Sequence, residues 1–201
     1  MKIAVIGSGN VGAALGEALV RAGHEIVFGV RGGAAEKPPV TGSTTNDVRS
    51  AILASEIVLL AVPWGAVPDV LGQVKDWSPK VLIDCTNPLG AGLELVLGLS
   101  TSGGEQVASL AKGARVVKAF NTTGFGNMKN PKYGGRGVTM LYATDDSAAA
   151  SIAEQVIRDV GFEPEFAGPL RQARYLEPFA ALWISMTNRL GRDFAFTLVR
   201  R

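Results

Sequence analysis

Short apolar runs alternate along the chain with segments whose apolar positions repeat at helical spacing. The continuous runs predict buried strands over residues 2–6, 25–28, 56–62, 80–84, 115–119, 138–143 and 163–166. The helical spacing predicts helices over residues 11–22, 47–55, 67–74, 105–112, 147–160 and 174–188. Alternation of this kind is typical of a mostly parallel sheet with helices covering both of its faces.

The order of these elements predicts a single Rossmann-type domain over residues 1–201, of the doubly wound α/β class. We expect its core in residues 1–123 and a short strand–helix extension in residues 137–201. Glycine-rich loops are expected over residues 29–42 and 124–137. No repeat of fixed period and no long hydrophilic linker marks a second domain in the sequence.

Composition narrows the function by exclusion. The 20 basic and 18 acidic residues give a net charge of +2 without any charged block, which argues against nucleic acid or an anionic membrane as partner. A single cysteine, Cys85, and a single histidine, His24, argue against a disulfide, a metal site or a histidine-dependent triad. The apolar N-terminal stretch breaks at Gly7, too early for a secretion signal or a membrane span, so we expect a cytoplasmic protein.

The glycine motif Gly-Ser-Gly-Asn-Val-Gly at residues 7–12 directly follows the first predicted strand and opens the first predicted helix. This is the context in which G-x-G-x-x-G binds a dinucleotide. Gly7 permits the tight turn, Gly9 leaves room for the pyrophosphate, and Gly12 allows close packing of helix and strand. The free N–H groups at the helix start then face the phosphates. The alternative is a glycine turn without a ligand.

The end of the second predicted strand favours NADP(H) over NAD(H). Proteins that bind NAD usually carry an acidic residue about 20 residues after the motif, where it holds the ribose 2′-hydroxyl. This chain has no acid there, and Arg31 can pair with a 2′-phosphate instead. Lys37 on the same loop is a second candidate. For both residues the alternative is a solvated surface cation.

Several further motifs accompany the glycine motif. They are G-H-E-I-V-F-G-V-R at 23–31, A-V-P-W at 61–64, D-C-T-N-P-L at 84–89, V-V-K-A-F-N-T at 116–122, T-D-D at 144–146 and A-R-Y-L-E-P at 173–178. Taken together, these motifs resemble the NADPH-dependent reductases of the deazaflavin coenzyme F420, in particular their bacterial members. The resemblance covers nearly the whole chain. The cytosolic reductase domains of the six-transmembrane metalloreductases are similar as well.

The resemblance implies an oxidoreductase that exchanges a hydride between NADP(H) and a small-molecule acceptor, coenzyme F420 or a flavin such as FMN. It implies that NADP lies among Gly7, Ser8, Gly9, Asn10, Val11, Gly12 and Arg31, then Ala61, Val62, Pro63 and Trp64, and then Asn87, Pro88, Leu89, Asn121 and Thr122. One position departs from the pattern, because relatives often have Ser or Thr where Val30 precedes the arginine.

The predicted sheet brings the same segments together without any reference to relatives. Ligands of open α/β sheets bind outside the carboxyl ends of the strands. The segments at those ends are Gly7, Arg31, Pro63-Trp64, Thr86-Asn87-Pro88 and Asn121-Thr122. Polar groups buried there need partners, which a ligand would supply. The alternatives are an Asn-Pro turn at 87–88, loop capping by Asn121 and Thr122, and packing of Trp64 on its own helix.

No catalytic residue is assigned. Hydride transfer between stacked rings needs no nucleophile, acid or base, only reacting atoms held about 3–3.5 Å apart. Lys118 lies in a predicted strand near the site and is a candidate catalytic lysine, although no acidic partner is evident. Arg174 and Glu177 are three positions apart and are expected to pair on the surface of the last helix.

Two other functions stay open, namely an NADPH-dependent reductase of a carbonyl or imine and a non-catalytic NADPH sensor. Only about 35 residues follow the last predicted strand, whereas such carbonyl and imine reductases usually append a long helical domain. An open cleft beside the nicotinamide favours an enzyme, and a cleft plugged by Phe125, Met128 or Tyr133 favours a sensor.

The last predicted helix carries an apolar face. Its members are Phe179, Leu182, Trp183, Ile184 and Met186. At helical spacing such residues are typical of a core or a dimer face. Since the resemblance places dimer contacts in this region, we expect a homodimer.

Overall fold

The computed structural model describes residues 1–33 and 37–201. Its main sheet has eight strands in the order β10-β9-β6-β5-β4-β1-β2-β3. Their bounds are β1 (Lys2–Ile6), β2 (Glu25–Gly29), β3 (Thr44–Asn46), β4 (Ile57–Leu60), β5 (Val81–Asp84), β6 (Arg115–Lys118), β9 (Thr139–Thr144) and β10 (Glu163–Gly168). All neighbours pair in parallel except β6 and β9, which pair antiparallel. The predicted Rossmann-type, mostly parallel sheet is therefore confirmed.

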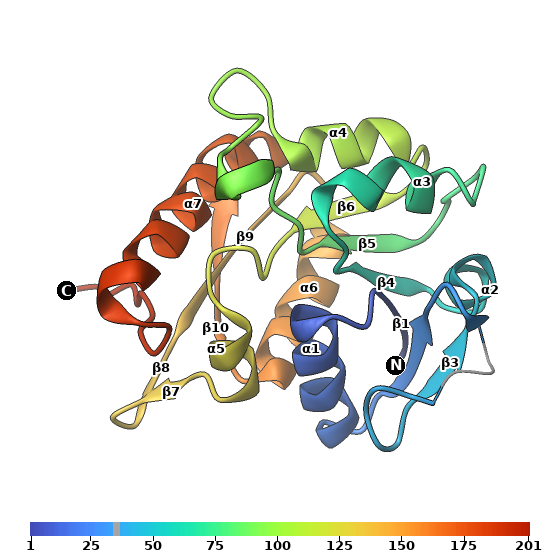
Figure 1. Ribbon diagram of the computed structural model, residues 1–201, viewed down its shortest axis with the longest axis horizontal. Coiled ribbons are helices and arrows are strands. Elements are labelled where there is room, and N and C mark those ends of the chain that lie inside the picture. The colour runs from blue at the N-terminus through green and yellow to red at the C-terminus, as the bar shows by residue number, and fades with distance from the viewer. Residues whose placement is uncertain (34–36) are drawn as a thin grey trace.

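Helices cover both faces of this sheet (Figure 1). The helical segments are α1 (Asn10–Arg21), α2 (Val48–Leu53), η2 (Trp64–Ala66), α3 (Val67–Leu71), η3 (Ala91–Leu93), α4 (Gly103–Leu110), α5 (Phe125–Lys129), α6 (Ser147–Val160), η4 (Leu170–Gln172) and α7 (Ala173–Leu190). Ile3 and Val5 of β1 belong to the buried cluster that includes residues of α1 and α6, whereas Ala4 and Ile6 belong to the cluster with α2, α3 and α4. Because alternate side chains meet opposite layers, both faces are apolar.

Side-chain caps explain where several helices begin and end. Asp146 accepts a hydrogen bond from the Ala149 backbone N–H at the start of α6, and Gly161 ends that helix at φ 107°. The predicted bounds 147–160 therefore agree with the structure. At α4 the Ser102 hydroxyl oxygen accepts from the Glu105 N–H, so this helix begins at Gly103, two residues before the predicted start.

Several short elements were missed by the sequence analysis. The strand β3 follows the first glycine-rich loop, whose residues 34–36 lie outside the described part of the chain. The predicted loop 124–137 contains α5 and a small hairpin of β7 (Lys132–Tyr133) and β8 (Arg136–Gly137). Gly134 and Gly135 make its turn at positive φ. These elements are too short for apolar periodicity to indicate them.

The chain end returns along α7. Phe194 stacks on Trp183 with ring centroids 5.0 Å apart, and Phe196 packs on Phe179 at 4.8 Å. Trp183 is buried, whereas Leu182 on the same helix is 51% exposed. Part of the apolar face of α7 is therefore covered within the chain itself.

Candidate functional site

The glycine turn between β1 and α1 is built from three glycines that differ in what surrounds them. A Cβ atom on Gly7 would overlap the carbonyl oxygen of Ala61, and one on Gly12 would overlap that of Gly7. Those two glycines are required by the packing of the protein. Gly9 has an ordinary φ of −71°, and a Cβ there would meet nothing within 4 Å. The space at Gly9 therefore suits the close approach of a ligand to the backbone.

The start of α1 suits an anion. Gly9 is the N-cap, no side chain caps the helix, and its first turn contains no acidic residue. The first N–H groups of a helix have no intrahelical partner, and the helix dipole favours negative charge there. Ser8 and Asn10 are exposed beside this end, whereas Val11 packs against the core.

A groove of about 500 Å³ connects the glycine turn with the end of β2 and with α3. The predicted site residues that line it are Gly7, Ser8, Gly9, Arg31, Ala61, Val62 and Pro63. Arg31 is exposed, and no other described residue forms an ion pair with it. Lys37 is also exposed but does not line the groove. Arg31 is thus available to an external anion at this position.

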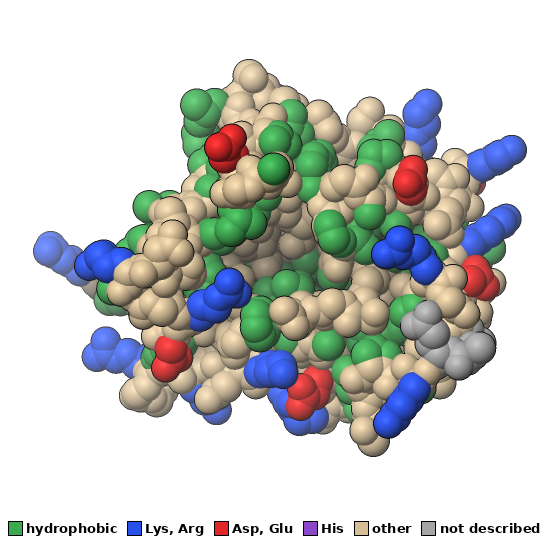
Figure 2. All heavy atoms as spheres, viewed as in Figure 1, with side chains coloured by type: hydrophobic (Ala, Val, Ile, Leu, Met, Phe, Trp, Pro, Cys, Tyr) green, Lys and Arg blue, Asp and Glu red, His purple; other side chains and the backbone are tan. Residues whose placement is uncertain are grey.

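The face at the carboxyl ends of the strands is hollowed at its centre (Figure 2), in the region that Figure 1 shows between α1 and α7. The loops after β5 and β6 meet at this edge. Asn87 Nδ2 donates to the Asn121 carbonyl oxygen at 3.0 Å, and Asn121 Nδ2 donates to Asn87 Oδ1 at 3.1 Å. The structure thus brings Asn87 and Asn121 together, as the strand-end argument expects.

Asn121 also connects this edge to α7. Its Nδ2 donates to the Leu176 carbonyl oxygen at 3.1 Å, so two acceptors fix the orientation of the amide. Asn121 Oδ1 is buried and has no hydrogen-bond partner in the described structure. Thr122 points elsewhere, because its hydroxyl lies 3.9 Å from the sulfur of Met140. A buried acceptor without a partner is costly, so this oxygen is suited to a donor supplied from outside.

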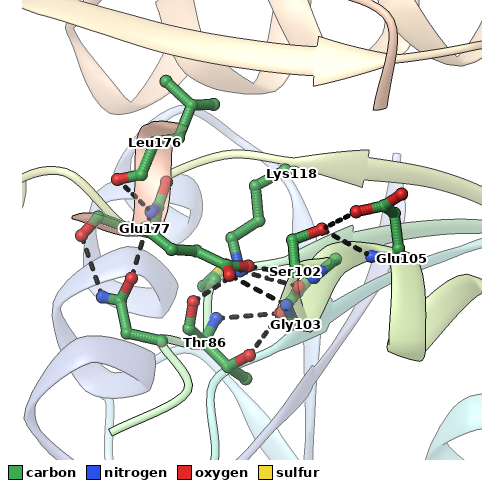
Figure 3. Close-up of polar contacts among 12 residues, drawn as sticks. Thr86, Ser102, Gly103, Glu105, Lys118, Leu176 and Glu177 are labelled. Atoms are coloured by element: carbon green, nitrogen blue, oxygen red, sulfur yellow. Dashed lines mark hydrogen bonds and ion pairs between the residues drawn. The ribbon is translucent and has the colours of Figure 1, made fainter. Parts of the chain in front are cut away.

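A buried ion network lies directly behind the strand ends (Figure 3). Lys118 Nζ is 2.9 Å from Asp84 Oδ2, 2.8 Å from Glu177 Oε1 and 2.7 Å from the Thr86 carbonyl oxygen. The three charged side chains are fully buried. Burial lowers the pKa of Lys118, but Asp84 and Glu177 more than compensate and raise it, so the ammonium is held protonated. With all three protons engaged, Lys118 has a structural role and is not free for catalysis.

The Glu177 carboxylate accepts hydrogen bonds from the backbone as well as from Lys118. Its two carboxylate oxygens accept from the N–H groups of Gly103 and Gly104 at 2.8 and 2.9 Å, at the start of α4 (Figure 3). The expected surface pair between Arg174 and Glu177 is therefore wrong. Arg174 instead binds Glu105 with contacts of 2.6 and 2.8 Å. Two residues three apart on α7 thus face different environments, because Glu177 lies on the buried side of the helix.

The network fixes the loop after β5. Thr86 donates from its N–H and its hydroxyl to Asp84 Oδ1, at 2.9 and 2.7 Å, and its carbonyl oxygen accepts from Lys118. The ring of Trp64 lies within 3.1 Å of a Cβ placed on Gly103, so Trp64 packs on the start of α4. The conformation of Thr86 is thus set by buried charges, whereas Asn87 is held by Asn121.

The residues considered as plugs lie elsewhere. Met128 is fully buried in the core. Phe125 and Tyr133 line a separate pocket with Arg192, and none of the three lines the groove at the glycine turn. The Cys85 thiol is buried, and burial raises its pKa, so it is not a reactive thiol.

Sequence analysis missed two polar side chains that line the groove, Asp69 and Gln73. They follow Ala66 at intervals of three and four positions, so one face of the helical segment after Pro63 carries all three. That spacing was visible, but no motif indicated which face turns to the groove. Among residues 1–33 and 37–201, no group of His, Cys, Asp and Glu could hold a metal ion. In the same ranges no helix combines the length and apolar character needed to cross a membrane.

The fold and the glycine turn define a protein of the Rossmann class. Residues 2–88 match the family described as NADP oxidoreductase, coenzyme F420-dependent. The match confirms the resemblance found in the motifs, because this part of the chain is similar to that family of NADP-dependent oxidoreductases.

Several known proteins are similar to the chain in sequence or in fold. Metalloreductase STEAP3 from Rattus norvegicus is 28% identical over 180 residues, which cover 88% of this chain and 36% of STEAP3. The chain thus spans about a third of that curated relative. A solved structure from Arthrobacter sp. FB24, provisionally assigned as an F420-dependent NADP reductase, is 27% identical over the full length of both chains with a TM-score of 0.90. A reductive aminase from Aspergillus terreus, solved with NADPH and ethyl levulinate, shares the fold at 20% identity and a TM-score of 0.70, over 94% of this chain and 62% of its own.

Proposed function

We propose that this protein binds NADP(H) in the groove at the glycine turn and exchanges a hydride with a deazaflavin of the coenzyme F420 type or a flavin-like acceptor. The observation that carries the proposal is the single groove that contains both the glycine turn and Arg31. A helix start without a capping side chain suits the pyrophosphate, and the open space at Gly9 admits it. The family match of residues 2–88 supports the same cofactor.

Arg31 supports the choice of NADP(H) within this proposal. The strand β2 ends at Gly29, and Val30 and Arg31 follow without an acid that would hold a 2′-hydroxyl. A guanidinium without an ion-pair partner among the described residues can form two parallel hydrogen bonds with a phosphate. Val30 is buried and contributes no hydrogen bond from its side chain.

The hollow at the strand ends supports an enzyme over a sensor. Bound NADP(H) supplies the hydride chemistry, and the chain orients and shields the reacting rings. Asn87, Asn121 and Thr86, which Lys118 holds, give this edge a fixed shape. A rigid open site is what ring-to-ring transfer requires.

The testing experiment has two stages. The purified protein is first titrated with NADPH and with NADH by calorimetry, and tighter binding of NADPH is expected. Coenzyme F420, FMN and a cyclic imine are then added separately, and the NADPH absorbance band is followed. Oxidation of NADPH with F420 or FMN supports the proposal. Oxidation with the imine alone would instead indicate that the protein is an imine reductase. Tight NADPH binding without any turnover would favour the sensor.

The oligomeric state stays a prediction. Leu182 and Tyr175 on α7 are 51% and 63% exposed and are available to a second copy. We therefore propose a homodimer through this region. Light scattering that reports a monomer at micromolar concentration would exclude it.

A further inference from the structure

Part of the groove lining is apolar. Val48 at the start of α2 and Val70 on α3 both line the groove, and each is 7% exposed; we call this apolar part of the lining the slot. Arg31 lines the groove as well. In a dinucleotide that carries a 2′-phosphate, the base attached to that ribose is adenine. If the proposed function holds, on which this inference rests, an apolar slot near Arg31 is therefore suited to the adenine ring.

Polar groups stand at the rim of this slot. Asp69 and Gln73 both line the groove from the segment after Pro63, and both are exposed. No ion pair or side-chain hydrogen bond occupies either of them within the described ranges. An acid in a groove that receives phosphates is unfavourable unless it faces a donor of the ligand. The position of Asp69 thus calls for a hydrogen-bond donor at the edge of the base.

Asp69 and Gln73 differ in the hydrogen bonds that they can form with a base. An ionised carboxylate only accepts hydrogen bonds, whereas a glutamine amide both donates and accepts. Adenine presents an amino group at position 6 next to ring nitrogens that accept. Asp69 matches the amino group alone, and Gln73 can donate to a ring nitrogen. Discrimination between purines therefore depends on Asp69 more than on Gln73.

We propose that Asp69 and Gln73 recognise the edge of the adenine base, with the Asp69 carboxylate accepting from the 6-amino group. A 6-oxo purine such as hypoxanthine places a carbonyl oxygen where adenine has its amino group. Two acceptors would then face each other, and the carboxylate would lose its amino partner. The neighbouring ring nitrogen N1 carries a proton in hypoxanthine, so it could no longer accept from Gln73. A site built to hydrogen-bond one group rejects the analogue that lacks it. The protein would therefore select its dinucleotide by the base as well as by the 2′-phosphate.

The test compares binding of NADPH and of its hypoxanthine analogue, reduced nicotinamide hypoxanthine dinucleotide phosphate. We expect the wild-type protein to bind NADPH at least about tenfold more tightly. In Asp69→Asn the amide can donate to the carbonyl oxygen of hypoxanthine, so the preference should vanish or reverse. Glu56→Gln removes the same charge at the amino ends of the strands, where Glu56 lines a different pocket, and should keep the wild-type preference.

The outcomes separate this inference from the function on which it rests. A wild-type protein that binds both dinucleotides equally, or an Asp69→Asn variant with an unchanged preference, would overturn the role of Asp69. Failure of the wild-type protein to bind either dinucleotide would instead overturn the proposed function. Because Asp69 is exposed on a short helix, the variant is expected to fold, and its thermal melting curve checks this.

Discussion

Two clusters of charge lie at the same edge of the sheet and differ in how completely they are satisfied. In the groove, Arg31 and Asp69 are exposed and form no ion pair within the described residues. Behind the strand ends, Lys118 and Glu177 are fully buried, and every ammonium proton of the lysine has an acceptor. Charges without partners are free to meet a ligand, whereas charges with complete partners hold the backbone in place.

This difference is visible in what each cluster connects. The buried cluster joins β5, β6, α4 and α7, segments that are far apart in the sequence. The groove is made of segments that each follow a single strand or begin a single helix. We therefore expect changes in the first cluster to alter stability and changes in the second to alter binding.

Glu177→Ala should have the largest effect of the changes considered. It removes the acceptor for the Gly103 and Gly104 N–H groups and one partner of Lys118, which leaves buried polar groups unpaired. Breaking such a pair costs about 3–5 kcal/mol. Urea unfolding measures the loss, and Asp69→Ala is the control, expected to lie within about 0.5 kcal/mol of wild type. Equal losses in the two variants would remove the distinction between the clusters.

Gly9→Val should abolish dinucleotide binding and leave the fold intact. A Cβ atom at Gly9 meets nothing within 4 Å beyond its chain neighbours, so a larger side chain there is expected to occupy the space that we assign to the pyrophosphate. Calorimetry with NADPH is the measurement, and a melting curve checks the fold. Gly12→Ala is the contrasting variant, because its new Cβ overlaps the Gly7 carbonyl oxygen and should lower stability. Retained NADPH affinity in Gly9→Val would place the cradle elsewhere.

Arg31→Ala should weaken NADPH much more than NADH. A charge-assisted hydrogen bond contributes about 1.5–3 kcal/mol, which corresponds to about 10- to 150-fold in affinity. Affinity for NADH, which has no 2′-phosphate, should change by less than about threefold. Lys37→Ala is a matched control, since Lys37 does not line the groove. A similar loss for both dinucleotides in Arg31→Ala would show that the arginine does not contact the 2′-phosphate.

The sheet and the glycine turn could be predicted because their signals are local. Continuous apolar runs mark strands that are buried on both faces, and the turn at Gly7 follows such a run directly. Arg31 was found for the same reason, since it comes two residues after a predictable strand end. The antiparallel entry of β9 beside β6 is not encoded locally, because pairing depends on how the chain returns.

The buried network could not be predicted for the opposite reason. Lys118 and Glu177 meet only after the sheet has formed and α7 has packed on it. From the sequence, Arg174 and Glu177 look like one surface pair, yet the helix presents one to Glu105 and buries the other. The positions of Asp69 and Gln73 could not be predicted either. Which side chains of a short helix face the groove depends on how the helix is rotated about its own axis, and the sequence does not indicate that rotation.

The ion pair of Arg174 and Glu105 is more exposed than the buried cluster and less exposed than the charges in the groove. Removing it should have the smallest effect on stability among the changes considered. The hydrogen bond from Arg174 lowers the pKa of Glu105 below its ordinary value of 4.5. A carboxyl group with a lowered folded-state pKa stabilises the protein above the unfolded pKa, and this stabilisation disappears as pH falls through the folded value. With the side chains 34% and 27% exposed, solvent screening limits the pair to about 0.5 kcal/mol. Urea unfolding of Glu105→Gln and wild type should differ by that amount at pH 7 and converge as pH falls below 4.5 and through the lowered folded-state pKa of Glu105. A deficit that persists in acid would show that Glu105 acts through its contact with Ser102 and not through its charge.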